Sequence, residues 1–235
     1  MDAGSALWQW AAPLGGLTFL GLTGALLIGD LEHPERFYMI FTRPQWRSWL
    51  VKGAFIIAGY AAVLLLHLAG ALAGAAPLLD VLMVAGIPLA VMTAVYTAYL
   101  FSQARARDLW QNPLLPAQLA VQAALAGAAA LALAAAWLAP DAVTRLLQIV
   151  AVAAAIHLLL VWGESTLGHA TAHARLASHE MTSGRYATAF WLGMVAMAGG
   201  MLTPWLGVAL VPLPLLGLMA YEHAYVQAGQ SVPLA

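Results

Sequence analysis

Hydrophobic stretches long enough to cross a membrane dominate the pattern along the chain. A membrane-crossing helix needs about 20 apolar residues, because the hydrocarbon layer is roughly 30 Å thick. Seven such stretches, separated by polar or proline-containing breaks, are predicted at residues 7–29, 49–73, 78–101, 115–138, 143–163, 186–203 and 205–226. Pro204, Pro212 and Pro214 disturb the last two, which are therefore kinked or re-entrant, so the count is six to eight. The pattern predicts an all-α, polytopic transmembrane helical bundle that forms a single membrane domain over residues 1–235.

The composition agrees with an integral membrane protein. Hydrophobic residues make up 63% of the chain and charged residues 8%, against roughly 45–50% and about 25% in soluble domains. A net charge of −1 without a basic tract excludes nucleic-acid binding. The chain has no cysteine, so any cysteine-ligated iron–sulfur cluster must belong to a partner.

The cationic side chains are distributed asymmetrically over the breaks. Eight of the nine follow the first, third and fifth stretches, namely Arg36, Arg43, Arg47, Lys52, Arg105, Arg107, Arg175 and Arg185. Arg145 alone falls on the other side of a seven-span topology. Because cytoplasmic loops carry the excess of Lys and Arg, we expect an N-terminus outside and a C-terminus in the cytoplasm. The expected location is the cytoplasmic membrane of a prokaryote, with lipid around the bundle.

Ionisable side chains in apolar spans are costly, and each is a candidate functional residue. Glu164 closes the fifth stretch and is either a proton-relay carboxylate or a helix-end residue at the interface. His157, in the same stretch, is a second relay candidate. Asp30 ends the first stretch, where a salt-bridged cap that positions the following loop is expected.

Histidines at membrane depth raise the question of a metal cofactor. His67, His157 and His223 lie on three different stretches and would permit a b-type haem, but a single membrane histidine more often hydrogen-bonds a neighbouring helix or a quinone carbonyl. His169 and His173 are four residues apart, yet without an obvious fourth ligand a solvated interfacial helix is favoured over zinc. We predict neither haem nor a metal site.

Two tyrosines in the third stretch have two interpretations. Tyr96 and Tyr99 are three residues apart and share a helical face. They fit the aromatic belt of the membrane interface, or hydroxyl donors to a quinone oxygen.

Four segments in which polar residues, glycine and proline interrupt the apolar pattern occur in the order that is typical of one protein family. They are GDLEHPERFYMIFTRPQWRSWLVKGA at 29–54, YTAYLFSQARARDLWQNPLLP at 96–116, GHATAHARLASHEMTSGRYATAFW at 168–191 and AYVQAGQSVPLA at 224–235. In this order they resemble the NrfD/PsrC family, the polysulfide-reductase-type membrane subunit.

The resemblance implies a subunit that anchors an iron–sulfur protein and a molybdopterin catalytic subunit with Mo or W, exchanges electrons with quinone, and lacks haem. It makes Tyr96 a quinone contact, Asp30 and Arg36 a structural ion pair, and Glu164 an acid of a proton path. Relatives usually have a further N-terminal helix. Here either a partner supplies that helix, or the site is built differently, or the start of the sequence is not complete, and Trp8, Gln9 and Trp10 at the mouth of the first span are further candidates for the site.

The resulting hypothesis is a quinone-interacting membrane anchor subunit of a respiratory oxidoreductase, which passes electrons between menaquinone or ubiquinone and a partner's iron–sulfur cluster. A quinone needs hydrogen-bond donors and a proton relay. The expected quinone-binding residues are Tyr96, His67 and Tyr99, and the expected relay residues are Glu164 and His157. The alternatives are a purely structural anchor without quinone and a proton-translocating or transporter-like subunit.

Overall fold

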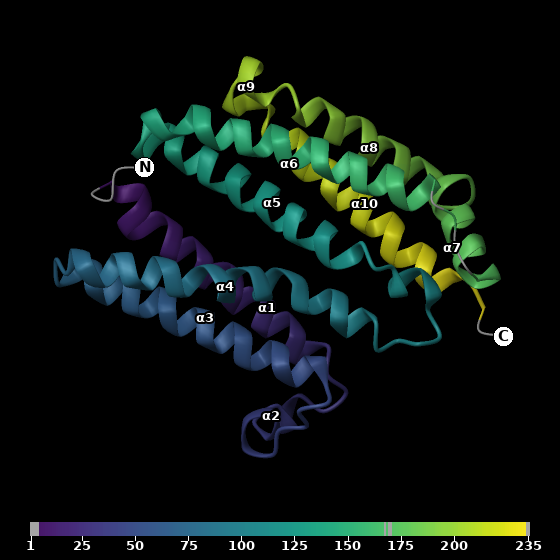
Figure 1. Ribbon diagram of the computed structural model, residues 1–235, viewed down its shortest axis with the longest axis horizontal. Coiled ribbons are helices and arrows are strands. Elements are labelled where there is room, and N and C mark those ends of the chain that lie inside the picture. Colours follow the sequence, from purple (N-terminus) through teal and green to yellow (C-terminus); the bar gives the residue numbers. More distant parts are fainter. Residues whose placement is uncertain (1–4, 167, 169–170, 234–235) are drawn as a thin grey trace. The chain divides into compact units, whose positions relative to one another are not determined.

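The computed structural model describes residues 5–166, 168 and 171–233, and every regular element in those residues is a helix. The contacts fall into two compact units, Met1–Leu100 and Phe101–Ala235, whose helices are labelled in Figure 1. The all-α polytopic class expected from the sequence is confirmed. A single membrane domain over the whole chain stays a prediction.

Six helices of the described residues are long and apolar enough to cross a membrane. They span Leu7–Gly29, Trp49–Leu72, Ala76–Phe101, Leu115–Leu138, Pro140–Thr166 and Val208–Ser231. A seventh apolar helix, α8 (Ala187–Gly200), has 14 residues and is about 21 Å long at 1.5 Å per residue. The described residues thus hold six spanning helices, or seven if α8 is included, and both numbers fall within the predicted range of six to eight.

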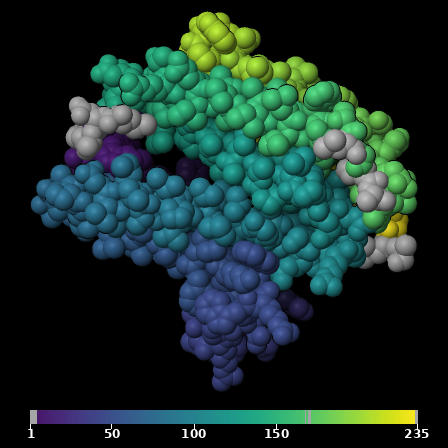
Figure 2. Space-filling model, in the orientation of Figure 1, coloured from purple at the N-terminus to yellow at the C-terminus, as the bar shows by residue number. Residues whose placement is uncertain are grey.

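Unit 1 consists of three long helices and a loop that carries short helical turns. A π-helical turn (Leu7–Ala11) leads into α1 (Ala12–Gly29), and α3 (Trp49–Leu72) is followed by α4 (Ala76–Phe101). The α3–α4 turn includes Gly74, whose φ of 65° suits glycine. Between α1 and α3, a 3₁₀ turn (Pro34–Arg36) and α2 (Met39–Thr42) form a lobe at the end of the unit, which projects in Figure 2.

Unit 2 is a bundle of α5 (Leu115–Leu138), α6 (Pro140–Thr166), α8 and α10 (Pro212–Ser231). A 3₁₀ turn (Asp108–Gln111) precedes α5, and the amphipathic α7 (Ala172–Thr182) connects α6 to α8. The α8 and α10 backbones cross closely, because a Cβ on Gly217 would lie 2.9 Å from the Gly193 carbonyl oxygen. Leu125, Ala153, Ala154 and Met197 form a buried core within this bundle.

The predicted bounds of the last two spans need correction. The sixth ends at Gly200 rather than at residue 203, and the seventh begins at Pro212 in α10, or at Val208 with a preceding 3₁₀ turn, rather than at residue 205. Pro204 and Pro212 each occupy the first turn of a helix, where the missing N–H costs nothing. They start α9 (Thr203–Leu206) and α10 instead of kinking a longer span.

Candidate functional site

Unit 1 contains a largely apolar cavity of about 280 Å³ beside the start of α1, the second half of α3 and the first half of α4. Its walls include Trp8, Pro13, Tyr60, His67, Leu82 and Met83. Small-molecule sites usually have mostly apolar walls and a few polar groups, with volumes that begin near 300 Å³. The cavity is therefore large enough for one small ring system.

His67 is the polar feature of this cavity. Its side chain is 6% exposed, and the edge of its ring meets the Trp8 ring at a centroid distance of 5.0 Å. The His67 Nε2 atom has no hydrogen-bond partner among the described residues. Buried polar atoms are nearly always paired, so His67 offers a free hydrogen-bonding nitrogen to a ligand. Of the three candidates at the mouth of the first span, Trp8 lines this cavity, and a role for them in a quinone site stays a prediction.

The two tyrosines expected beside His67 lie elsewhere in unit 1. Tyr96 is buried and packs against Gly53 in the first turns of α3, about 21 Å along the helix axis from His67 at 1.5 Å per residue. Tyr99 stacks on Trp49, with 4.4 Å between the ring centroids. The structure thus brings Tyr96 and Tyr99 to one end of the α3–α4 pair and His67 toward the other, so one quinone ring cannot contact all three.

The expected ion pair between Asp30 and Arg36 does not form. Both side chains are exposed, and no ion pair joins these two described residues. His33 instead lies 3.2 Å from Glu35 within the same loop. The physical reason is solvation, since exposed charges gain little from pairing. Asp30 ends α1 through its backbone N–H, which donates to Leu26 and Ile28 carbonyls.

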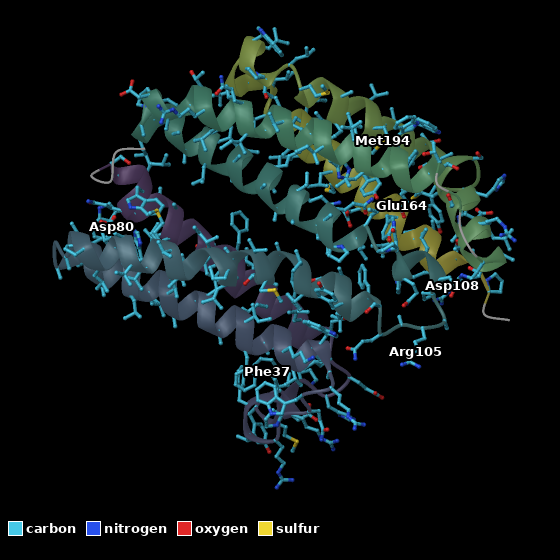
Figure 3. The ribbon with its side chains drawn as sticks, viewed as in Figure 1. Phe37, Asp80, Arg105, Asp108, Glu164 and Met194 are labelled. Carbon is cyan, nitrogen blue, oxygen red and sulfur yellow. The ribbon has the colours of Figure 1, made fainter. Side chains whose placement is uncertain are left out.

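Glu164 lies inside unit 2, at the wall of a second cavity. Its side chain is 4% exposed, and its Oε2 accepts a hydrogen bond of 2.8 Å from Gln118 Nε2 of α5. Its Oε1 has no partner among the described residues. The cavity measures about 530 Å³, and its walls include Asp108, Gln111, Asn112, Glu164 and Thr171. Figure 3 shows Glu164 among the helices of this unit, with Asp108 near the same end.

A second acid within the helices of unit 2, the half-buried Glu222, was missed by the sequence interpretation. Glu222 of α10 accepts a hydrogen bond of 2.6 Å from Gln122 Nε2 of α5. The signal was present, because Glu222 is an ionisable residue in an apolar span and meets the rule that singled out Glu164. The two glutamines carried no such signal, since uncharged amides do not stand out by charge.

His157 lies deeper in α6 than Glu164 and is completely buried. Neither ring nitrogen has a hydrogen-bond partner among the described residues. Its ring meets Tyr221 of α10 edge-on, with 4.7 Å between centroids. The Tyr221 hydroxyl oxygen is also buried and without a hydrogen-bond partner in the described part of the chain. Among the described residues, no chain of direct hydrogen bonds therefore joins His157 to Glu164.

No group of three metal-ligating side chains occurs within the part of the chain that the structure describes. The zinc alternative rested partly on His169, which lies outside the described residues. His173, its expected neighbour, begins α7 and has both ring nitrogens buried and without a partner in the described part.

Comparison with known proteins identifies the family. The sequence profile of polysulphide reductase, NrfD, matches residues 8–213, which include both cavities. No curated protein and no solved structure shows significant similarity to the chain. The match covers most of the sequence and confirms the family resemblance; three of the four segments lie within it, and the fourth, at 224–235, lies beyond it. The chain belongs to the NrfD family of membrane subunits of polysulphide-reductase-type oxidoreductase complexes.

Proposed function

We propose that the chain is the quinone-interacting membrane subunit of a respiratory oxidoreductase complex, and that the quinone ring occupies the cavity beside His67. A quinone interconverts with its quinol by two electrons and two protons. The chain's own contribution in unit 1 is to bind the ring between apolar walls and to supply a hydrogen bond to one of its oxygens.

The observation that carries this proposal is the unpartnered Nε2 of His67. A neutral imidazole nitrogen bearing hydrogen donates to a carbonyl, and without hydrogen it accepts from a hydroxyl. It therefore suits both the quinone and the quinol. Trp8 and Tyr60 add aromatic surface in the same cavity, and aromatic rings stack favourably on a planar ligand.

Unit 2 supplies the proton relay in this proposal. Glu164 reaches the 530 Å³ cavity, which gives it access to water, and His157 lies deeper in the same helix, against Tyr221. The walls of this cavity come from the segments that carry or adjoin Arg107 and Arg175. Cation-rich loops face the cytoplasm, so we propose that Glu164 exchanges protons with the cytoplasmic side of the cytoplasmic membrane. With α8 counted as a crossing, the N-terminus lies outside and the C-terminus lies in the cytoplasm.

Electrons leave or enter through partner subunits. The chain contains no cysteine, and iron–sulfur clusters are held by cysteine thiolates. We therefore propose an iron–sulfur partner, and beyond it a molybdopterin subunit with Mo or W. Purification of the complex in mild detergent, followed by subunit identification and metal analysis, tests this assignment. Recovery of the chain alone, without Fe and without Mo or W, would contradict it and favour a transporter-like role.

Binding of short-chain naphthoquinone and benzoquinone analogues to the purified chain tests the quinone site itself. We expect His67→Phe to weaken binding at least tenfold, whereas His67→Gln, which keeps a donor, retains more of it. Leu66→Phe is the matched control, because Leu66 precedes His67 on α3 and is 53% exposed. Equal affinity in wild type and His67→Phe would show that the chain anchors its partners without using this cavity for quinone.

A further inference from the structure

Two carboxylates in unit 2, the buried Glu164 and the half-buried Glu222, are held in matching ways. Glu164 of α6 accepts from Gln118, and Glu222 of α10 accepts from Gln122. The two glutamines are four residues apart on α5, which places them one turn apart on the same face. One face of α5 therefore presents two amide donors, each to an acid from a different helix.

This arrangement leaves three buried polar atoms without partners among the described residues. They are Glu164 Oε1, Gln118 Oε1 and the hydroxyl oxygen of Tyr221, in side chains that are 4%, 0% and 1% exposed. Two of the three can only accept hydrogen bonds unless the carboxyl carries a proton. The Tyr221 hydroxyl carries one hydrogen and can satisfy at most one acceptor, so the other acceptor requires a proton on the carboxyl group or a water molecule.

Both carboxylates accept from amide groups of one helix. Gln118 and Gln122 are about 6 Å apart along the axis of α5 at 1.5 Å per residue, so the two acids lie against neighbouring turns of the same helix face. The remaining titratable groups around them are His157 on α6, Tyr225 and His223 on α10, and Asp108 at the cavity wall. Two like charges in a poorly solvated site repel strongly, and such pairs titrate as a unit.

We propose that Glu164 and Glu222 form one two-carboxylate proton site, in which the protonation of either acid changes the proton affinity of the other. This inference rests on the proposed relay role of Glu164 and adds its second member.

The cavity determines which of the two acids receives a proton first. Glu164 lines the 530 Å³ cavity, whereas Glu222 does not appear in its wall. A proton from the cavity therefore reaches Glu164 first and Glu222 second. Glu222 stores the proton farther along the relay, alongside His157.

An infrared titration of the purified chain without quinone tests the coupling. The carboxyl signals of Glu164 and Glu222 are assigned from Glu164→Gln and Glu222→Gln, and both are followed against pH. We expect Glu222→Gln to move the midpoint of the Glu164 signal by about one pH unit or more toward lower pH, because a neighbouring negative charge is removed. Asp80→Asn, an acid of α4 in unit 1, is the control and should leave both midpoints unchanged. An unchanged Glu164 midpoint in Glu222→Gln would overturn the proposal.

Since these measurements contain no quinone, failure of quinone binding at His67 and failure of the carboxylate pair remain distinguishable.

Discussion

The spanning helices of the two units differ in how much of their surface lies inside the protein. In the most apolar windows of the three unit 1 spans, 6%, 11% and 22% of residues are buried, against 33%, 39% and 33% in unit 2. A helix surface that faces lipid stays apolar, whereas a buried interior can hold polar groups that pair across helices. The difference agrees with an apolar cavity in unit 1 and with hydrogen-bonded carboxylates in unit 2.

The polar groups of the two sites also differ in kind. Unit 1 offers one unpartnered imidazole nitrogen among apolar walls, and unit 2 offers two acids held by amides. The first suits the orientation of an uncharged ring, and the second suits storage of a proton. Within unit 1 the His67 cavity is remote from the cation-rich lobe, whereas in unit 2 the Glu164 cavity adjoins a cation-rich segment.

The largest expected effect comes from breaking the dense packing of unit 2. Gly217→Leu puts a side chain where a Cβ alone would lie 2.9 Å from backbone atoms of α8. Overpacking of this kind destabilises by about 3 kcal/mol, which tryptophan fluorescence during thermal unfolding would detect. The matched control is Gly21→Ala in α1 of unit 1, where nothing lies within 4 Å. Equal losses of stability in the two variants would contradict the difference in packing.

A smaller effect is expected at the end of unit 2 that holds the cavity. Arg107 Nη1 donates to the carbonyl oxygens of Gln230 at 3.0 Å and Val232 at 2.9 Å, and thereby ties the end of α10 to the segment before α5. We expect Arg107→Gln to cost about 1–2 kcal/mol and to speed proteolysis after α10. Arg105→Gln, two residues away and exposed, should change neither quantity. If Arg107→Gln unfolded as the wild type does, the contact between Arg107 and the end of α10 would not stabilise this end of unit 2.

The smallest effect is expected at Tyr96. Tyr96→Phe keeps the ring that packs on Gly53 and removes a hydroxyl far from the His67 cavity. Affinity for naphthoquinone and benzoquinone analogues should change less than about twofold, the range typical of positions without a binding contact. A tenfold loss of affinity would indicate that the quinone ring binds at the opposite end of α3 and α4, and would contradict its assignment to the His67 cavity.

Much of the fold was predictable because apolar length sets the span of a membrane helix. The predicted span 115–138 coincides with α5, and the predicted 49–73 differs from α3 by one residue. The last two spans failed at their boundary, since a proline can kink a helix or start one, and the pattern alone does not decide between these.

The sites were predictable only in part. Intramembrane charge singled out Glu164, and the same rule would have found Glu222. The prediction grouped Tyr96 with His67 although α3 and α4 run in opposite directions. His67 lies near the C-terminal end of α3 and Tyr96 near the C-terminal end of α4, so the two side chains lie toward opposite ends of the helix pair. The contacts of Gln118 and Gln122 depend on the rotation of α5 against α6 and α10, which periodicity does not fix in a helix that is apolar all round.

The division of roles between the two units is tested most directly by the affinity of a short-chain naphthoquinone for two variants of the purified chain, His67→Phe and Glu164→Gln. We expect a loss of at least tenfold in His67→Phe and a change of less than twofold in Glu164→Gln. A loss of tenfold in Glu164→Gln together with unchanged affinity in His67→Phe would place the quinone in unit 2 and contradict the account.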